Sequence, residues 1–181
     1  MMNGEIWVFG YGSLLWQPGF DYADRHIARL SGFHRSFCMR SIHHRGSVAE
    51  PGLVLALDRR EGAFCDGLAF RVAPGRAAET LAYLRERELI SSAYLEQEHP
   101  VALRGGATVM ATCYVIDAAH EQYCGGLPLA EQAEIIARAK GGRGPNDAYL
   151  FNTAAHLREL GIEDDDLNRL ESMVRALGAQ K

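Results

Sequence analysis

The order of the sequence patterns constrains the fold of this chain more than any other feature. The first 116 residues contain six short apolar segments with turn residues between them, and such segments are typical of β-strands. They lie at 6–9, 32–41, 53–58, 63–72, 94–103 and 107–116. One helical pattern interrupts them at 74–90, and three more follow at 127–142, 146–161 and 163–178. Strands first and helices later indicate an α+β fold rather than alternating βαβ units.

Composition and charge narrow the class of protein. A chain of 181 residues with a net charge of −4 is most simply one domain, residues 1–181. The acidic balance argues against nucleic acid as a partner, because neutralising phosphates needs clustered Lys and Arg. No apolar run approaches the ~20 residues that span a membrane. The N-terminus also lacks the basic start and long apolar core of a signal peptide. We therefore expect a cytoplasmic monomer that contacts no membrane.

The four cysteines argue against a metal centre. Cys38, Cys65, Cys113 and Cys124 are scattered, and no two of them form a C-x-x-C pair. Structural zinc sites need such paired spacings. We expect free, mostly buried thiols in a reducing compartment, and no metal.

An unusual loop follows the first strand. In the stretch Trp7–Phe20, WVFGYGSLLWQPGF, an apolar run ends abruptly in GYGS at 10–13. Four interpretations compete: a dinucleotide-binding turn, a nucleophilic serine, a tight structural turn, and a backbone cradle for another ligand. The dinucleotide fingerprint fails because its third glycine position is Leu15 and no βαβ unit surrounds it. A serine nucleophile needs G-x-S-x-G, whereas Ser13 is followed by two leucines.

The residues alone leave the last two interpretations open. Glycines at 10 and 12 permit positive φ angles and let backbone N–H groups approach a ligand without a Cβ in the way. Successive N–H groups in such a turn can bind a carboxylate or a developing oxyanion. A tight turn with Tyr11 in the core would use the same glycines for packing.

One carboxylate in the helix at 74–90 breaks the pattern of its neighbours. At 100° per residue, Glu88 falls between Leu81 and Leu84, on the face that should meet the core. Glu79 and Glu86 fall on roughly the opposite side. A carboxylate aimed at apolar surroundings should have a raised pKa, which suits a base that works near neutral pH. The alternative is that the helix frays before residue 88 and Glu88 reaches water.

Other charged residues near these patterns have simpler interpretations. Arg85 and Arg87 flank the core-facing stripe, and we expect their charges to extend outward into solvent. The acidic run EDDD at 163–166 precedes a helical pattern, where the helix dipole stabilises negative charge. We interpret that run as a helix cap and not as a metal site.

Motifs along nearly the whole chain resemble a known family. They are WVFGYGSLLW at the start, HRG followed by PGLVLAL, GLAFR, YLRERE, QYCGGLPL and PNDAYLFN. Together they resemble the ChaC-like, glutathione-specific γ-glutamylcyclotransferases. The resemblance implies a small mixed β-barrel-like core flanked by helices. It also implies a cofactor-free reaction that cyclises the γ-glutamyl group of glutathione and releases 5-oxoproline and cysteinylglycine.

The resemblance also assigns roles to residues of this chain. The loop that it implies for holding the γ-glutamyl group consists of Val8, Phe9, Gly10, Tyr11, Gly12 and Ser13. The catalytic base that it implies is Glu88, and family position and helical phase both favour Glu88 over Glu86. Arg45 is a candidate for binding the glycine carboxylate of glutathione, with an ordinary surface charge as the alternative. Tyr149 is a further candidate binding residue whose alternative is core packing, and Tyr123 carries the same two interpretations.

Two other functions remain to be weighed. An enzyme of the same architecture could act on other γ-glutamyl amino acids or on γ-glutamylamines, since the loop and Glu88 recognise only the γ-glutamyl half. A non-catalytic regulatory binding module belongs to a different class, and the presence of Glu at position 88 argues against it.

Overall fold

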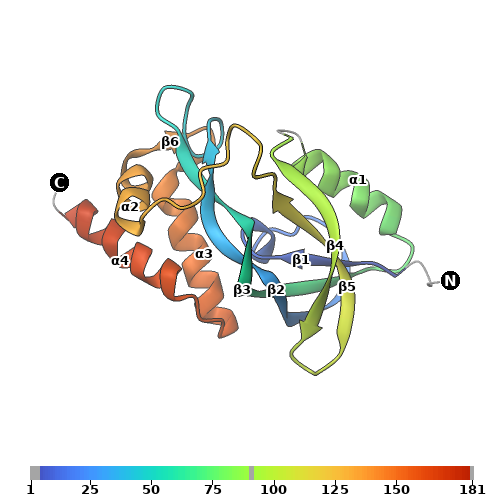
Figure 1. The fold of residues 1–181 in the computed structure, drawn as a ribbon. Helices are drawn as coiled ribbons and strands as arrows, with labels where there is room; N and C mark the ends of the chain where they lie inside the picture. The colour runs from blue at the N-terminus through green and yellow to red at the C-terminus, as the bar shows by residue number, and fades with distance from the viewer. Residues whose placement is uncertain (1–4, 90–91, 180–181) are drawn as a thin grey trace. The chain divides into compact units, whose positions relative to one another are not determined.

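The computed structural model describes residues 5–89 and 92–179, and it confirms an α+β fold with a strand-rich first half and a helical C-terminal part (Figure 1). The strands are β1 Trp7–Gly10, β2 Tyr22–Ser41, β3 Gly52–Val72, β4 Tyr94–Leu103, β5 Thr108–Ile116, β6 Lys140–Gly141 and β7 Gly144–Pro145. The helices are α1 Ala77–Glu88, α2 Leu129–Arg138, α3 Asn146–Leu160 and α4 Asp165–Ala179, and a 3-10 turn, η1, spans Ser13–Leu15. Ile90, the last residue of the helix predicted at 74–90, lies outside the described residues.

The first five strands close into a barrel in the order β1-β3-β2-β4-β5, with a further pairing between β3 and β5. β1 runs antiparallel to β3, where Gly10 pairs with Leu68, and parallel to β5, where Trp7 pairs with Ala111. β4 and β5 form an antiparallel hairpin. The expected mixed, barrel-like core is confirmed. Pairing of β1 on both sides fixes the point at which the loop after Gly10 begins.

Two strands are longer than predicted. The segments predicted at 53–58 and 63–72 belong to one strand, β3, and β2 starts well before the predicted residue 32. The charged residues at 59–61 have the composition of a turn, yet the backbone continues through them with their side chains exposed. Gly62, which follows them, has a φ of 81°, a conformation that glycine adopts without strain. The charged composition of residues 59–61 therefore indicates that they are exposed, and it does not indicate that the chain turns there.

The chain divides into two compact units. The first consists of Met1–Arg35 and Leu57–His120, and the second of Ser36–Ala56 and Glu121–Lys181. β1, α1, β4 and β5 belong to the first unit, whereas α2, α3 and α4 belong to the second. Within the second unit, α2 packs against both α3 and α4 (Figure 1). The acidic run before α4 acts as the predicted cap, because Asp164 Oδ1 accepts a hydrogen bond from the backbone N–H of Leu167 at 3.1 Å.

Asn146 has a different role from the one that a helix-start pattern suggests. Pro145 is the N-cap of α3, and Asn146 is the first helical residue, fully buried. Its side chain hydrogen-bonds both backbone groups of Leu53: Oδ1 accepts from Leu53 N–H and Nδ2 donates to Leu53 C=O, each at 2.8 Å. The amide therefore ties α3 to the start of β3 within the second unit.

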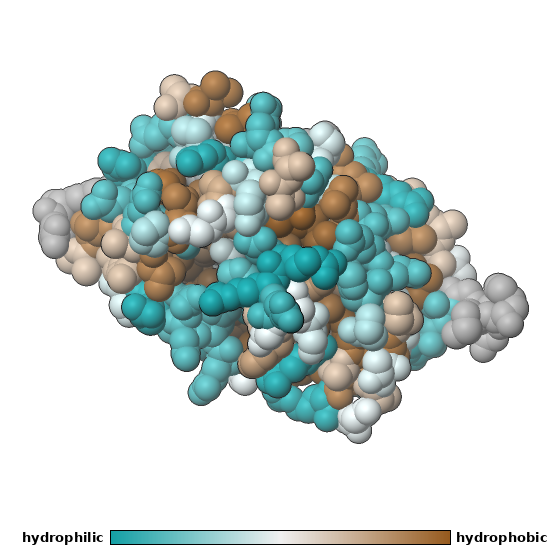
Figure 2. All heavy atoms as spheres, viewed as in Figure 1, coloured by the Kyte–Doolittle hydropathy of each residue, from teal (hydrophilic) through white to brown (hydrophobic). Residues whose placement is uncertain are grey.

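Both hydrophilic and hydrophobic residues reach the surface on the face drawn in Figure 2. On the face drawn in Figure 2, hydrophobic residues lie in small groups between hydrophilic ones. The large exposed hydrophobic side chains include Val48, Phe64 and Met110. No helix within residues 5–89 and 92–179 is long and apolar enough to cross a membrane.

Replacing Asn146 with Ala should destabilise the protein by about 2–4 kcal/mol, because it leaves the buried N–H and C=O of Leu53 without their partner. Urea unfolding of wild type and variant measures the difference. Asn152→Ala is the matched control, since Asn152 lies exposed on the same helix; it should change the free energy of unfolding by less than about 0.5 kcal/mol. Equal effects of the two substitutions would contradict this account.

Candidate active site

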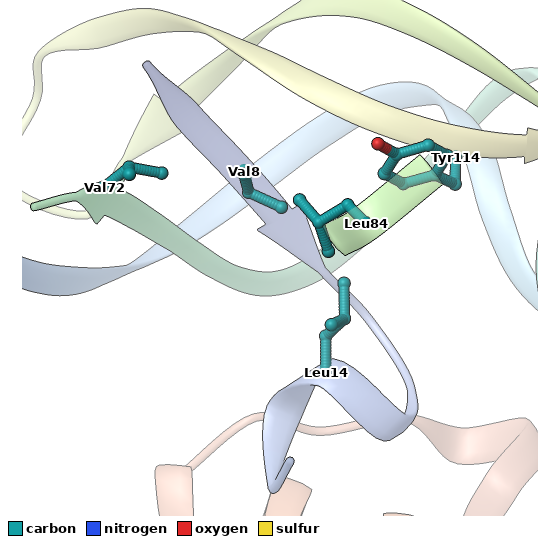
Figure 3. Packing of buried hydrophobic residues seen from close by; sticks show 5 residues of the cluster. All are labelled: Val8, Leu14, Val72, Leu84 and Tyr114. Carbon is teal, nitrogen blue, oxygen red and sulfur yellow. The ribbon is translucent and has the colours of Figure 1, made fainter. Parts of the chain in front are cut away.

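The loop after β1 is anchored by an apolar cluster in the first unit. Val8, Leu14, Val72, Leu84 and Tyr114 are all buried there and pack together. In Figure 3, the side chains of Val8 on β1 and Leu14 on η1 extend toward Leu84 on α1. Burial of a leucine of this kind contributes about 1.5–3 kcal/mol. The cluster therefore holds α1 against the strand and turn that flank the glycine sequence.

Gly10, the first glycine of the loop, serves close packing. Gly12 has a φ of −139°, and Gly10 is not among the glycines with positive φ, so the positive angles that glycine permits are not used at either position. A Cβ on Gly10 would lie only 3.1 Å from both the Leu14 Cβ and the ring of Phe70. A Cβ on Gly67 of β3 would lie 2.3 Å from the Gly10 carbonyl oxygen. Backbone approaches backbone here too closely for side chains.

Tyr11 points into the core, as the structural-turn interpretation predicts. Its side chain is buried, and its hydroxyl donates to the Tyr114 carbonyl at 3.2 Å. Arg35, also buried, donates from Nε to the Tyr11 carbonyl at 2.7 Å and from Nη2 to the carbonyl of Asp66. Sequence reasoning missed Arg35, because an arginine in a strand carries no signal that its partner is a distant carbonyl. The loop backbone is thus held from both sides.

The loop then turns into η1. Leu15 N–H donates to the Gly12 carbonyl at 2.9 Å, and Gln17 N–H donates to the Ser13 carbonyl at 2.8 Å. The first N–H groups of such a turn have no acceptor within it, and here they belong to residues 12–14. Val8 and Phe9 are fully buried within the barrel. Core packing by Tyr11 and a backbone cradle at 12–14 are therefore compatible.

Glu88 lies on the predicted face of its helix. It is the last residue of α1, one turn beyond the fully buried Leu84, and its side chain is 16% accessible. The alternative, in which the helix frays before residue 88 and leaves Glu88 in water, is wrong. Glu86 is exposed, as its phase predicts.

Arg87 does not extend into solvent, and that expectation is wrong. Its side chain is only 17% accessible, and its Nη2 donates to Ser13 Oγ at 3.0 Å. Its Nε lies 3.6 Å from Glu88 Oε1. One guanidinium therefore lies beside both the loop serine and the helix carboxylate. Arg85 is exposed as expected, but it pairs with Glu96.

A polar network lies beside this helix end. Tyr114 on β5 donates to Glu96 Oε1 at 2.9 Å, and Arg85 donates to both oxygens of Glu96 at 3.0 and 2.9 Å. The hydrogen bond from Arg85 holds the pKa of Glu96 below its usual range. Burial raises the pKa of Tyr114, and the hydrogen bond to Glu96 and the charges of Glu96 and Glu88 raise it further. At neutral pH, Tyr114 therefore remains a hydroxyl and Glu96 a carboxylate.

The remaining predicted site residues lie in the second unit. Arg45 donates to the Pro145 carbonyl at 3.1 Å, and its guanidinium lies 5.5 Å from the centre of the Tyr149 ring. Burial lowers the pKa of Arg45. Tyr149 is buried, accepts from Leu55 N–H through its hydroxyl at 3.2 Å and meets Phe37 edge-on, so it packs in the core. Binding roles for Arg45 and Tyr149 stay predictions.

Tyr123, the other tyrosine with two interpretations, is partly buried, and its backbone forms an isolated bridge to Met39. These contacts decide neither its binding role nor its packing role.

The structure agrees with the expected state of the cysteines. All four are free; Cys38, Cys65 and Cys113 are buried, and Cys124 is partly so. Burial raises the pKa of Cys113 to about 12. In the described parts of the chain, no three His, Cys, Asp or Glu side chains are grouped so that they could hold a metal ion.

Known proteins resemble this chain over almost its full length. The ChaC-like protein family matches residues 6–177. The glutathione-specific γ-glutamylcyclotransferase of Escherichia coli strain K12 is 37% identical over 178 residues, which cover 98% of this chain and 76% of the relative. Its counterpart in Schizosaccharomyces pombe is 36% identical over 192 residues, covering 96% and 94%. A crystal structure of a yeast γ-glutamylcyclotransferase specific to glutathione matches with a TM-score of 0.85 at 26% identity, covering 95% of this chain and 96% of that one.

Replacing Glu96 with Gln tests the network beside α1. The folded-state pKa of Glu96 lies below its unfolded value, so its contribution to stability is present above the unfolded pKa and is lost as the pH falls through the folded pKa. At neutral pH the variant should be less stable than wild type, and the difference should shrink as the pH falls to about 3. Urea unfolding at a series of pH values measures it. Glu98→Gln, an exposed position on the same strand, is the control; a pH-independent difference for Glu96→Gln would contradict the prediction.

Proposed function

The chain belongs to the ChaC-like protein family, and from that membership we propose that it is a glutathione-specific γ-glutamylcyclotransferase. The observation that carries the proposal is the near-complete coverage of the chain by relatives of that name in a bacterium and a fungus. A partly buried Glu88, beside an arginine that bonds the glycine loop, supports it with chemistry.

The reaction is an intramolecular cyclisation. The α-amine of the γ-glutamyl group attacks the carbon of its own side-chain amide, which closes a five-membered lactam. The bond from that carbon to the cysteine nitrogen breaks, giving 5-oxoproline and cysteinylglycine. Because both reacting groups belong to one molecule, the protein must mainly hold the substrate in a reactive conformation.

Glu88 is the proposed base. The attacking amine is mostly an ammonium at neutral pH, and the departing nitrogen needs a proton. One carboxylate can accept a proton from the ammonium and deliver it to the leaving nitrogen. Of the two protons that remain on the attacking nitrogen, one stays in the lactam and the other passes to the product amine or to solvent. The raised pKa that this role favours in Glu88 stays a prediction.

The loop from Val8 to Ser13 is the proposed cradle for the γ-glutamyl group. The backbone N–H groups at 12–14 and the hydroxyl of Ser13 are donors for the substrate carboxylate or for the tetrahedral oxyanion. One preorganised donor of this kind contributes about 3 kcal/mol to a rate. Phe9, Gly10 and Tyr11 shape the loop through their packing.

No cofactor or metal has a role in this mechanism. We further propose that residues 1–181 act as one domain, as a cytoplasmic monomer that binds neither nucleic acid nor membrane. The net charge of −4 supports the absence of nucleic acid. The alternative enzyme, acting on other γ-glutamyl amino acids or γ-glutamylamines, would keep the loop and Glu88. A regulatory binding module would need neither turnover nor a base.

Purified protein incubated with glutathione should release 5-oxoproline and cysteinylglycine, which chromatography measures. Glu88→Gln should lower kcat by roughly 10²–10⁴-fold, because it removes the proton carrier. Glu86→Gln is the matched control on the exposed side of the same helix turn and should retain wild-type activity. Turnover of γ-glutamyl-alanine but not of glutathione would favour the alternative enzyme, with the same mechanism and a different substrate. If the folded protein turns over neither substrate, the proposed enzymatic function is wrong and the regulatory binding module remains.

Substitution of Arg45 tests recognition of the cysteinylglycine half. Arg45→Gln should raise KM for glutathione by roughly 10-fold, the cost of one hydrogen bond between charged groups, and should affect γ-glutamyl-alanine less. Arg138→Gln, exposed in the last turn of α2, is the control. An unchanged KM for glutathione would contradict a binding role for Arg45 and favour the alternative, an ordinary surface charge.

A further inference from the structure

We propose that Arg87 is a positioning residue that holds the Ser13 hydroxyl as a hydrogen-bond donor and fixes the loop at 13–18 relative to Glu88. This inference rests on the proposed function and adds a residue to its machinery. It is carried by the contacts of one guanidinium group that is mostly withdrawn from solvent.

The contact with Ser13 sets the direction of its hydrogen bonding. An arginine has only donors, so the Ser13 oxygen accepts when Arg87 Nη2 approaches to 3.0 Å. The single hydrogen of the hydroxyl takes no part in that bond and remains to be donated. In the proposed reaction, its acceptor is an oxygen of the γ-glutamyl group. Without the arginine, the hydroxyl could rotate and accept instead.

The same guanidinium holds the chain beyond the turn. Its Nη1 donates to the carbonyls of Gln17 at 2.5 Å and Pro18 at 3.2 Å, and to the hydroxyl of Tyr83 at 3.1 Å. Tyr83 and Arg87 are four residues apart and share one face of α1.

The next residue of the loop, Gly19, reinforces that attachment. It has a φ of 77°, and a Cβ built there would lie 2.0 Å from the Tyr83 hydroxyl oxygen. The tyrosine therefore lies directly over the glycine, and Arg87 and Tyr83 together fasten residues 17–19 to the helix.

Glu88 completes the arrangement. Arg87 Nε lies 3.6 Å from Glu88 Oε1, so the same planar group lies beside the proposed base and bonds the proposed donor. Cyclisation needs both groups at once, and a shift of about 1 Å in such a group can cost roughly 100-fold in rate. A lysine offers one point of charge and lacks the fork that reaches several acceptors in one plane.

Arg87→Met should lower kcat for glutathione by roughly 100-fold with little change in KM, because orientation is lost while the substrate is still bound. Arg87→Lys should recover only a small part of the loss. Ser13→Ala should lower kcat in the wild-type background but add little to Arg87→Met, since the two groups act as one unit. Arg76→Met, an exposed arginine at the start of α1, is the control and should match wild type.

Amide hydrogen exchange supplies a readout that does not depend on turnover. Exchange within residues 13–19 should be faster in Arg87→Met than in wild type or Arg76→Met. Wild-type kcat in Arg87→Met, a loss confined to KM, or full additivity with Ser13→Ala would overturn the inference. If wild type does not turn over glutathione, the proposed function fails, and unchanged exchange at 13–19 in Arg87→Met would then overturn the positioning role as well.

Discussion

The packing of Leu84 against Val8 and Leu14 is the contact on which the candidate site depends. It brings the last turns of α1 onto the first strand and the turn that follows it. Glu88 lies one helical turn beyond Leu84 on the same face, so whatever fixes the leucine also fixes the direction of the carboxylate. An apolar contact thus sets the position of a polar group, which is left partly accessible because the helix ends there.

Packing alone leaves the rotation of polar groups undetermined, and hydrogen bonds supply the missing restraint. Arg35 holds the carbonyl of Tyr11, and Tyr114 binds Glu96 while its own carbonyl accepts from Tyr11. Arg87 holds the Ser13 hydroxyl of the loop by donating a hydrogen bond to its oxygen. Fully paired networks of this kind favour one geometry over its neighbours. These hydrogen bonds therefore restrain the orientation of the polar groups around the candidate site.

Periodicity predicted much of this arrangement and missed the rest for an identifiable reason. The α+β class, α1 and the inward face of Glu88 follow from which positions are apolar, and that information is local. For the loop and for Glu88, the residues alone left two interpretations open. The resemblance to a family supplied the roles proposed for them, substrate binding and the catalytic base. Arg87, Arg35 and Asn146 have partners far away in the chain, and a polar residue carries no local mark of its partner. Continuity of β3 through its charged residues was missed because exposure and chain reversal share one composition.

The burial of the cysteines has a consequence for a protein proposed to handle a thiol. Thiolates, and not thiols, exchange with disulfides. Burial raises the pKa of Cys113 to about 12, so at neutral pH this side chain is a thiol and not a thiolate. Cys38 and Cys65 are equally buried, and the pKa of Cys124 is also raised by burial. Burial therefore disfavours a mixed disulfide between these cysteines and a thiol substrate.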